Sequence, residues 1–202
     1  MIKAVVFDVG GVLIRTPDRS SRLAWEQRLG LDEWESEEIV FGGEMGTKAQ
    51  VGEVSDEALW RWVGRRLELN SAQLDDFRRD FWRGDVLDLD LVDYIRRLRP
   101  RYRTAIISNA TDALRGRLTN EYPIDDAFDL IVVSAEEHTM KPEREIYLRA
   151  LARLGRPAGE VIFVDDSPAN VTAAQELGME SLLFHPTIDL VRELAQFGVH
   201  AR

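Results

Sequence analysis

The feature that most constrains the fold is a series of short, largely apolar runs that alternate with helical segments. The runs are rich in β-branched residues, which is typical of strands buried on both faces of a parallel sheet. Strands separated by helices predict an α/β protein with a doubly wound, Rossmann-like parallel sheet. The predicted strands cover residues 4–7, 104–107, 130–133, 161–164 and 181–184.

Helical segments separate these strands in the second half of the chain. Pro142 suits the first turn of one helix, because that position needs no backbone N–H donor. Gly178 can end another helix in a left-handed conformation. The predicted helices cover residues 89–98, 111–118, 143–154, 168–177 and 188–197.

Residues 16–84 differ from the rest, because they contain no convincing buried strand. Apolar residues recur at helical spacing in residues 22–29, 55–67 and 71–82, and all five tryptophans lie in this part of the chain. Aromatic residues at such spacing more often form a core than a ligand platform. The prediction is a helical unit at 16–84, inserted into a second unit made of residues 1–15 and 85–202. The glycines at positions 42, 43, 46 and 52 predict either a mobile loop or a simple connector within it.

Composition narrows the classes of function. The 202 residues carry a formal net charge of −10, which argues against the basic surface that nonspecific nucleic-acid binding requires. The sequence has 0 cysteines, so disulfides, thiolate metal sites and cysteine nucleophiles are excluded. No apolar run approaches membrane-spanning length, and no signal-peptide pattern opens the chain. We therefore expect a cytoplasmic protein without membrane partners; the sequence gives no indication of its oligomeric state.

Polar residues follow three of the strands at the point where each strand ends. Because the carboxyl ends of parallel strands meet at one edge of a sheet, we expect these side chains to gather there. Gly10 and Gly11 let the backbone turn tightly beside a bound group. Lys141, at a helix start, is expected to join them. The residues are Asp8 after the first strand, Ser108 and Asn109 after the second, and Asp165 and Asp166 after the fourth.

The chemistry of this set is complementary. Three carboxylates close together repel one another unless a cation lies among them, and oxygen ligands without His or Cys favour Mg²⁺. A hydroxyl, an amide and a lysine suit a phosphate. Each residue alone has an ordinary interpretation: Ser108 and Asn109 as a helix cap, the aspartate pair as turn residues, and Lys141 as a solvated side chain. Their occurrence together, in this order, favours a site.

These motifs resemble those of the haloacid dehalogenase-like hydrolases, most of which are phosphatases. The resemblance rests on FDVGGVL, IISNA, Lys141-Pro142 and FVDDSPANV, and it covers nearly the whole chain. It implies that Asp8 is a nucleophile that forms an aspartyl-phosphate. It also implies that Ser108 and Lys141 hold the phosphoryl group, with Asn109 beside it. Residues 16–84 resemble the family's helical cap.

The resemblance further implies a Mg²⁺ site. Its ligands are Asp8, the backbone carbonyl of Gly10 and Asp166, with Asp165 nearby through water. In such a site the metal and the lysine offset the charge of the phosphoryl oxygens.

The sequence departs from the family pattern at Gly10, where its phosphatases usually carry an aspartate that protonates the leaving group. General acid–base help is typically worth ~10²–10⁴-fold. Glu44, Glu53 and His138 are candidates for a replacement acid. Another interpretation is a substrate whose leaving group needs little protonation. Some relatives similar to this sequence at FDxG lack the aspartate, and sugar-phosphate hydrolysis is attributed to them.

The expected function is a Mg²⁺-dependent phosphatase for a small phosphorylated metabolite, with a sugar phosphate as one candidate. Two alternatives stay open. One is a 2-haloacid dehalogenase, since the family's dehalogenases also lack the second aspartate. By the same resemblance, however, those enzymes use no metal and carry no aspartate pair like Asp165 and Asp166. A phosphate-binding or regulatory protein would keep the site without turnover, although a pure binder has no need of the nucleophile Asp8.

Overall fold

A five-stranded parallel sheet forms the centre of the larger unit, in the order β5-β4-β1-β6-β7. The structure is a computed structural model and describes residues 1–201. The expected α/β fold with a Rossmann-like parallel sheet is confirmed. The strands are β1 (Ala4–Phe7), β4 (Arg103–Ser108), β5 (Leu130–Val133), β6 (Val161–Asp165) and β7 (Glu180–Leu183).

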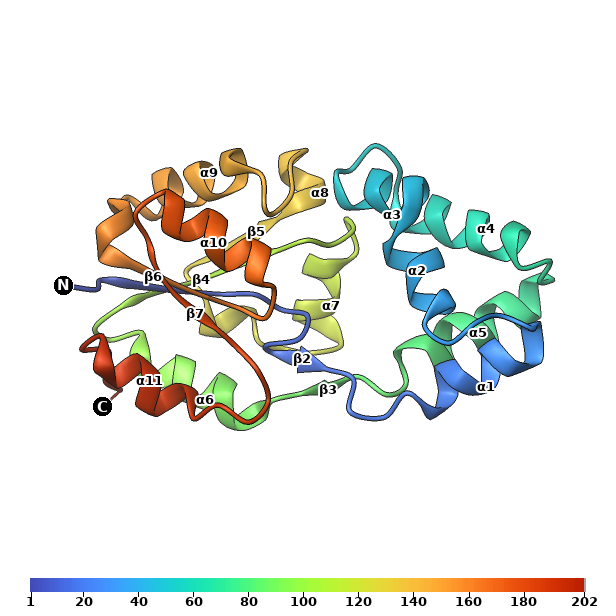
Figure 1. Cartoon of the computed structure of the whole chain (residues 1–202), viewed down its shortest axis with the longest axis horizontal. Helices are drawn as coiled ribbons and strands as arrows, with labels where there is room; N and C mark the ends of the chain where they lie inside the picture. The colour runs from blue at the N-terminus through green and yellow to red at the C-terminus, as the bar shows by residue number, and fades with distance from the viewer. Residues whose placement is uncertain (202) are drawn as a thin grey trace.

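Helices cover both faces of this sheet (Figure 1). In β1, Val5 and Phe7 pack on one face, whereas Ala4 and Val6 pack on the other, as the pleat of a strand requires. Val5 and Phe7 share a core with α6 (Leu89–Leu98), α7 (Leu114–Asn120) and α11 (Leu190–Gln196). Ala4 and Val6 share a second core with α9 (Arg144–Leu154) and α10 (Pro168–Glu176). Short helical elements complete the unit: η1 (Asp125–Ala127), α8 (Ser134–Glu137) and η2 (Ala158–Glu160).

The strand register places the polar strand ends beside one another. Phe7 in β1 pairs with Val164 in β6, so the residues that follow them, Asp8 and Asp165, are neighbours across the two strands. The backbone N–H of Asp8 donates to the Val164 carbonyl at 2.9 Å. On the other side of β1, Phe7 pairs with Ile106, which brings Ser108 to the same edge.

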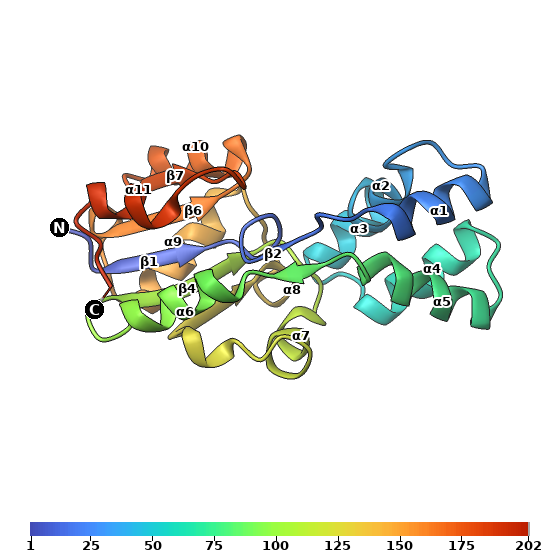
Figure 2. The same ribbon diagram turned by 90° about the horizontal axis from the view of Figure 1, so that it is seen from below.

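The helices of residues 20–82 form a separate bundle, here called the helical module, beyond the carboxyl edge of the sheet (Figure 2). Aromatic rings fill its core: Trp60 lies 5.7 Å from Phe81 and 6.2 Å from Phe77, centroid to centroid. Among the helices of residues 1–201, none is long and apolar enough to cross a membrane. The module consists of α1 (Ser20–Leu29), α2 (Glu35–Phe41), α3 (Gly43–Gln50), α4 (Asp56–Arg66) and α5 (Ser71–Trp82).

The glycine-rich stretch is a connector only in part: residues 43–50 form the helix α3, where the prediction of a loop or connector is wrong, whereas Gly42 and Gly52 lie between helices. Gly42 separates α2 from α3, and Gly46 lies inside α3. A Cβ on Gly46 would lie 2.5 Å from the backbone carbonyl oxygen of Phe41. The glycine therefore permits the close approach of two consecutive helices, and this packing outweighs its low helix propensity. The helix α2 was also not predicted.

Two chain segments connect the module to the sheet. They pair as the short antiparallel strands β2 (Ile14–Arg15) and β3 (Val86–Leu87). Asp85 accepts hydrogen bonds from Thr16 at 2.7 Å and from the buried Arg22 at 3.0 Å. A Cβ on Gly84 would lie 1.9 Å from the Asp18 carbonyl oxygen. The two segments are thus held tightly together where the module begins and ends.

Candidate active site

Lys141 lies between two carboxylates at the carboxyl edge of the sheet. Its Nζ is 2.9 Å from Oδ1 of Asp8 and 2.6 Å from Oδ2 of Asp165. Only 1% of Lys141 is exposed. A buried ammonium is tolerated when opposite charges surround it, and here two carboxylates do so.

The backbone of Lys141 is fixed by Asn109. The Asn109 amide donates to the Lys141 carbonyl at 2.8 Å, and the Lys141 N–H donates to Asn109 Oδ1 at 2.8 Å. This pair of bonds ties the end of β4 to the segment before α9. Asn109 was expected beside the phosphoryl group; it lines the neighbouring cavity, but its side chain is engaged with Lys141.

Asp165 is fully buried and held by three donors. Its Oδ1 accepts from the Ser167 N–H at 2.8 Å and from the Asn170 side chain at 3.0 Å, while Oδ2 accepts from Lys141. Asn170 sits in the first turns of α10, and its part in the site was not predicted. The signal available in the sequence was its place in the FVDDSPANV motif, five residues after Asp165.

The carboxylates of Asp8, Asp165 and Asp166 gather closely enough to share one cation. Oxygen atoms of the three lie within 4.8 Å of one another. One lysine offers a single positive charge against three negative ones. Asp166 packs against Gly11, whose φ is +75°; a Cβ there would lie 2.0 Å from Asp166 Oδ2. The three carboxylates offer only oxygen ligands, and the neighbouring residue, Gly11, has no side chain. This donor set fits a hard divalent cation such as Mg²⁺.

Burial and two charged neighbours together set the pKa of the Asp8 carboxyl group. Burial raises the pKa of Asp8 to about 6, although Lys141 opposes this shift and Asp165 adds to it. Its Oδ1 accepts from the Val9 N–H at 2.7 Å and from Lys141. Within residues 1–201, Oδ2 has no such hydrogen bond.

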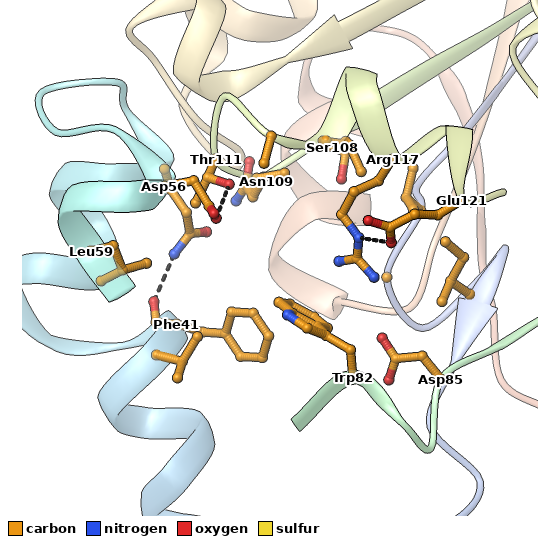
Figure 3. A pocket seen from close by; sticks show the side chains of 18 of the residues that line it. Phe41, Asp56, Leu59, Trp82, Asp85, Ser108, Asn109, Thr111, Arg117 and Glu121 are labelled. Carbon is orange, nitrogen blue, oxygen red and sulfur yellow. Dashed lines mark hydrogen bonds and ion pairs between the residues drawn. The ribbon is translucent and has the colours of Figure 1, made fainter. Parts of the chain in front are cut away.

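A cavity of about 510 Å³ opens between the carboxyl edge of the sheet and the helical module (Figure 3). Gly10, Gly11 and Ser108 line it on the sheet side. Ser108 is 4% exposed, and within the described chain its hydroxyl makes no hydrogen bond, so it is free to donate to a ligand. On the module side the lining is aromatic and aliphatic, from Phe41, Leu59 and Trp82.

Every carboxylate in the cavity wall is paired with an arginine. Asp56 is 2.6 Å from Arg78, Asp85 is 3.0 Å from Arg22, and Glu121 is 2.9 Å from Arg117. The Arg117 guanidinium also lies 4.1 Å from the ring of Trp82. These wall residues were not predicted: Asp56 begins α4, Glu121 follows α7 and Asp85 lies before β3, and none of these positions carries a sequence signal for a cavity.

The structure places none of the candidate replacement acids in this cavity. Glu44 is exposed and paired with Lys48 at 2.5 Å. Glu53 is exposed, and His138 contacts the Val51 carbonyl at 3.0 Å through its Nδ1. At Gly10 itself, a Cβ would meet no atom within 4 Å. The structure therefore has room for an acidic side chain at position 10.

The fold and the carboxylate cluster are accompanied by a match of the sequence to one family of hydrolases. Residues 2–178 match the family model of the haloacid dehalogenase-like hydrolases, so the chain belongs to that family. This confirms the resemblance seen in the motifs, and with it the classification as an enzyme.

Relatives over nearly the full length carry phosphatase names. The chain is 26% identical to a sesquiterpene phosphatase of Aspergillus oryzae, over 96% of this chain and 95% of that protein. It is 29% identical to a D-ribitol-5-phosphate phosphatase of Bacteroides thetaiotaomicron, over 90% and 91%.

Solved structures of the family superpose on the whole chain. A HAD-like family hydrolase from Porphyromonas gingivalis gives a TM-score of 0.79 at 25% identity and covers 98% of each chain. A HAD family enzyme from Bacteroides thetaiotaomicron, in complex with magnesium, gives 0.78 at 25% identity and covers 96% of this chain and 98% of its own.

Proposed function

We propose that this enzyme is a Mg²⁺-dependent phosphatase that hydrolyses a small phosphorylated compound through an aspartyl-phosphate on Asp8. The observation that carries the proposal is the Asp8 carboxylate, whose Oδ1 is bound by Lys141 at 2.9 Å while its oxygens share a carboxylate cluster with Asp165 and Asp166. A nucleophile, a buried cation and a metal-binding set converge there, as phosphoryl transfer requires.

Asp8 is oriented for attack by its own hydrogen bonds. The Val9 N–H and Lys141 hold Oδ1, so Oδ2 is the atom proposed to attack phosphorus. The electron pair of the broken phosphorus–oxygen bond leaves with the leaving group. Water then hydrolyses the aspartyl-phosphate and restores the carboxylate, so that one difficult displacement becomes two easier ones.

Ser108 and Lys141 are proposed to bind the phosphoryl oxygens. The Ser108 hydroxyl faces the cavity, and the Lys141 ammonium adds positive charge beside Asp8. Asn109 acts by holding the backbone of Lys141, as its two 2.8 Å bonds indicate.

Mg²⁺ would be held by Asp8, Asp166 and the backbone carbonyl of Gly10. Both oxygens of Asp165 already accept protein hydrogen bonds, which supports a contact through water for this residue. When bound, the metal would neutralise charge on the phosphoryl group.

Residues 16–84 are proposed to act as a cap over a catalytic unit of residues 1–15 and 85–202. Thr111, after β4, donates to Asp56 of the helical module at 2.8 Å. The Asp56 N–H donates to Asp112 at 2.8 Å. Such bonds between the two units favour a closed arrangement that shields the reacting group from water.

The test is phosphate release from p-nitrophenyl phosphate and a panel of small phosphate esters, with Mg²⁺ and with EDTA. We expect Mg²⁺-dependent release that Asp8→Asn abolishes. Circular dichroism of Asp8→Asn would show that the variant is folded. No release from any ester would overturn the proposal, and 2-haloacids would then test the dehalogenase alternative. Binding of Mg²⁺ and phosphate without turnover would indicate a binding protein.

A further inference from the structure

The cavity wall on the side of the helical module, across from Gly10 and Ser108, carries aromatic side chains. The rings of Phe41 and Trp82 face the cavity (Figure 3), and their centroids are 5.7 Å apart. Phe41 is 43% exposed, so part of its ring is accessible to a ligand. An apolar wall of this kind, next to a few polar groups, is the usual form of a site for a small ligand.

The carboxylates of the same wall are already paired, whereas Nη2 of Arg117 has no hydrogen-bond partner within residues 1–201. Asp56, Asp85 and Glu121 each bind an arginine within 3.0 Å. A polyhydroxylated leaving group would have to compete for these acceptors, because hydroxyl groups need partners when they are buried. A ring system needs no such partners and would pack against Phe41.

The missing acid restricts the leaving group further. No side chain stands at Gly10, and the cavity carboxylates are bound to arginines, so a leaving oxygen must depart largely as an anion. A phenol has a pKa of about 10, as in tyrosine. Water, and an aliphatic alcohol with it, ionises only at a far higher pKa. When no proton is supplied, a phenolate therefore leaves far more readily than the more basic alkoxide of an aliphatic ester.

We propose that the substrate class is aryl phosphates, that is, phosphate monoesters of a phenol on an apolar ring system that packs against Phe41 and Trp82. The inference rests on the proposed phosphatase activity. An Asp8 oxygen bonds to phosphorus, the bond from phosphorus to the phenolic oxygen breaks, and its electron pair leaves on the phenolate. Water then displaces phosphate from Asp8, and the proton that this water loses ends on the phenolate through solvent.

Three probes separate the effect of the leaving group from the effect of the apolar ring. The first is 1-naphthyl phosphate, and the second is 2-(1-naphthyl)ethyl phosphate, which carries the same ring on an aliphatic oxygen. Acetyl phosphate is the third, because it has a good leaving group without a ring. We expect kcat/KM for the naphthyl ester to exceed that of the naphthylethyl ester by ~10²–10⁴-fold, the usual contribution of general acid–base catalysis.

Two variants test the residues. Phe41→Ala should raise KM for 1-naphthyl phosphate about 3–10-fold, the contribution of one aromatic contact, and should change KM for acetyl phosphate much less; Phe41→Leu is the matched apolar control. Gly10→Asp has room for its side chain. It should raise kcat/KM for the naphthylethyl ester far more than for the naphthyl ester, whereas Gly10→Asn should not.

The outcomes distinguish the two proposals. Mg²⁺-dependent hydrolysis with equal rates on the aryl and alkyl esters would overturn the aryl class and leave the phosphatase standing. A faster reaction with polyol phosphates than with naphthyl phosphate would do the same. No hydrolysis of any probe, acetyl phosphate included, would overturn both.

Discussion

The Nζ of Lys141 lies 2.6 Å from Oδ2 of Asp165, and both side chains are 0% exposed. The two residues come from different elements, the segment before α9 and the end of β6. Because neither charged group is exposed to solvent, each is stabilised in the folded protein by the opposite charge of the other. This pair is also what holds the ammonium next to Asp8.

Lys141→Met should therefore destabilise the protein strongly. The variant leaves two buried carboxylates without their cation, and removing one partner of a buried ion pair costs about 3–5 kcal/mol. The measurement is the free energy of unfolding by urea at pH 7 in EDTA. Lys141→Met/Asp165→Asn should lose less than the sum of the two single losses, because the residues interact directly. Additive losses would contradict the coupling.

The parallel sheet and its polar edge could be predicted from the sequence, because strands buried on both faces leave apolar runs with abrupt ends. The position of Asp8 beside Asp165 follows from that topology. The bonds of Asn109 could not be predicted, since they join it to Lys141, 32 residues along the chain. A side-chain amide carries no signal for its partner.

The helical module was harder to predict. The helix α3 contains Gly46, and local propensity favours a loop there; the helix forms because the glycine lets the end of α2 approach. The cavity wall was likewise beyond sequence reasoning. Phe41 and Trp82 belong to different helices, and their shared face exists only after the module has folded.

The stability of the helical module should depend on the charge of Glu37. Burial alone would raise the pKa of Glu37, but hydrogen bonds from Arg19, Ser36 and Arg22 lower it to about 2. A pKa below its usual value of 4.5 means that the stabilisation is present above pH 4.5 and is lost as the pH falls toward 2. Glu37→Gln should lose about 2 kcal/mol at pH 7, typical of hydrogen bonds to charged groups.

Urea unfolding of both proteins between pH 7 and pH 2 tests this dependence. The difference between wild type and Glu37→Gln should shrink as the pH falls below 4.5. A difference that stays constant down to pH 2 would show that the carboxylate charge is not responsible.

Gly11→Ala should disturb the proposed metal site, whereas Gly10→Ala should not affect folding. Gly11 has a φ of +75°, and a Cβ there would lie 2.0 Å from Asp166 Oδ2; a Cβ on Gly10 would meet nothing within 4 Å. Strain of this kind costs about 1–3 kcal/mol. Calorimetry should show a lower Tm for Gly11→Ala and weaker Mg²⁺ binding, because Asp166 must move. An unchanged Tm for Gly11→Ala would contradict the packing.

Thr111→Val should weaken the closure of the helical module over the cavity. The variant keeps the shape of the side chain but removes the hydroxyl that donates to Asp56 at 2.8 Å. Losing a hydrogen bond of about 1 kcal/mol would raise KM about 5-fold, and the Asp56 amide, which donates to Asp112, should exchange its hydrogen faster. Thr119→Val is the matched control, because among the described residues that hydroxyl bonds only to the Arg115 carbonyl within its own helix. Equal effects of the two variants on KM would show that the Thr111–Asp56 bond does not hold the module closed.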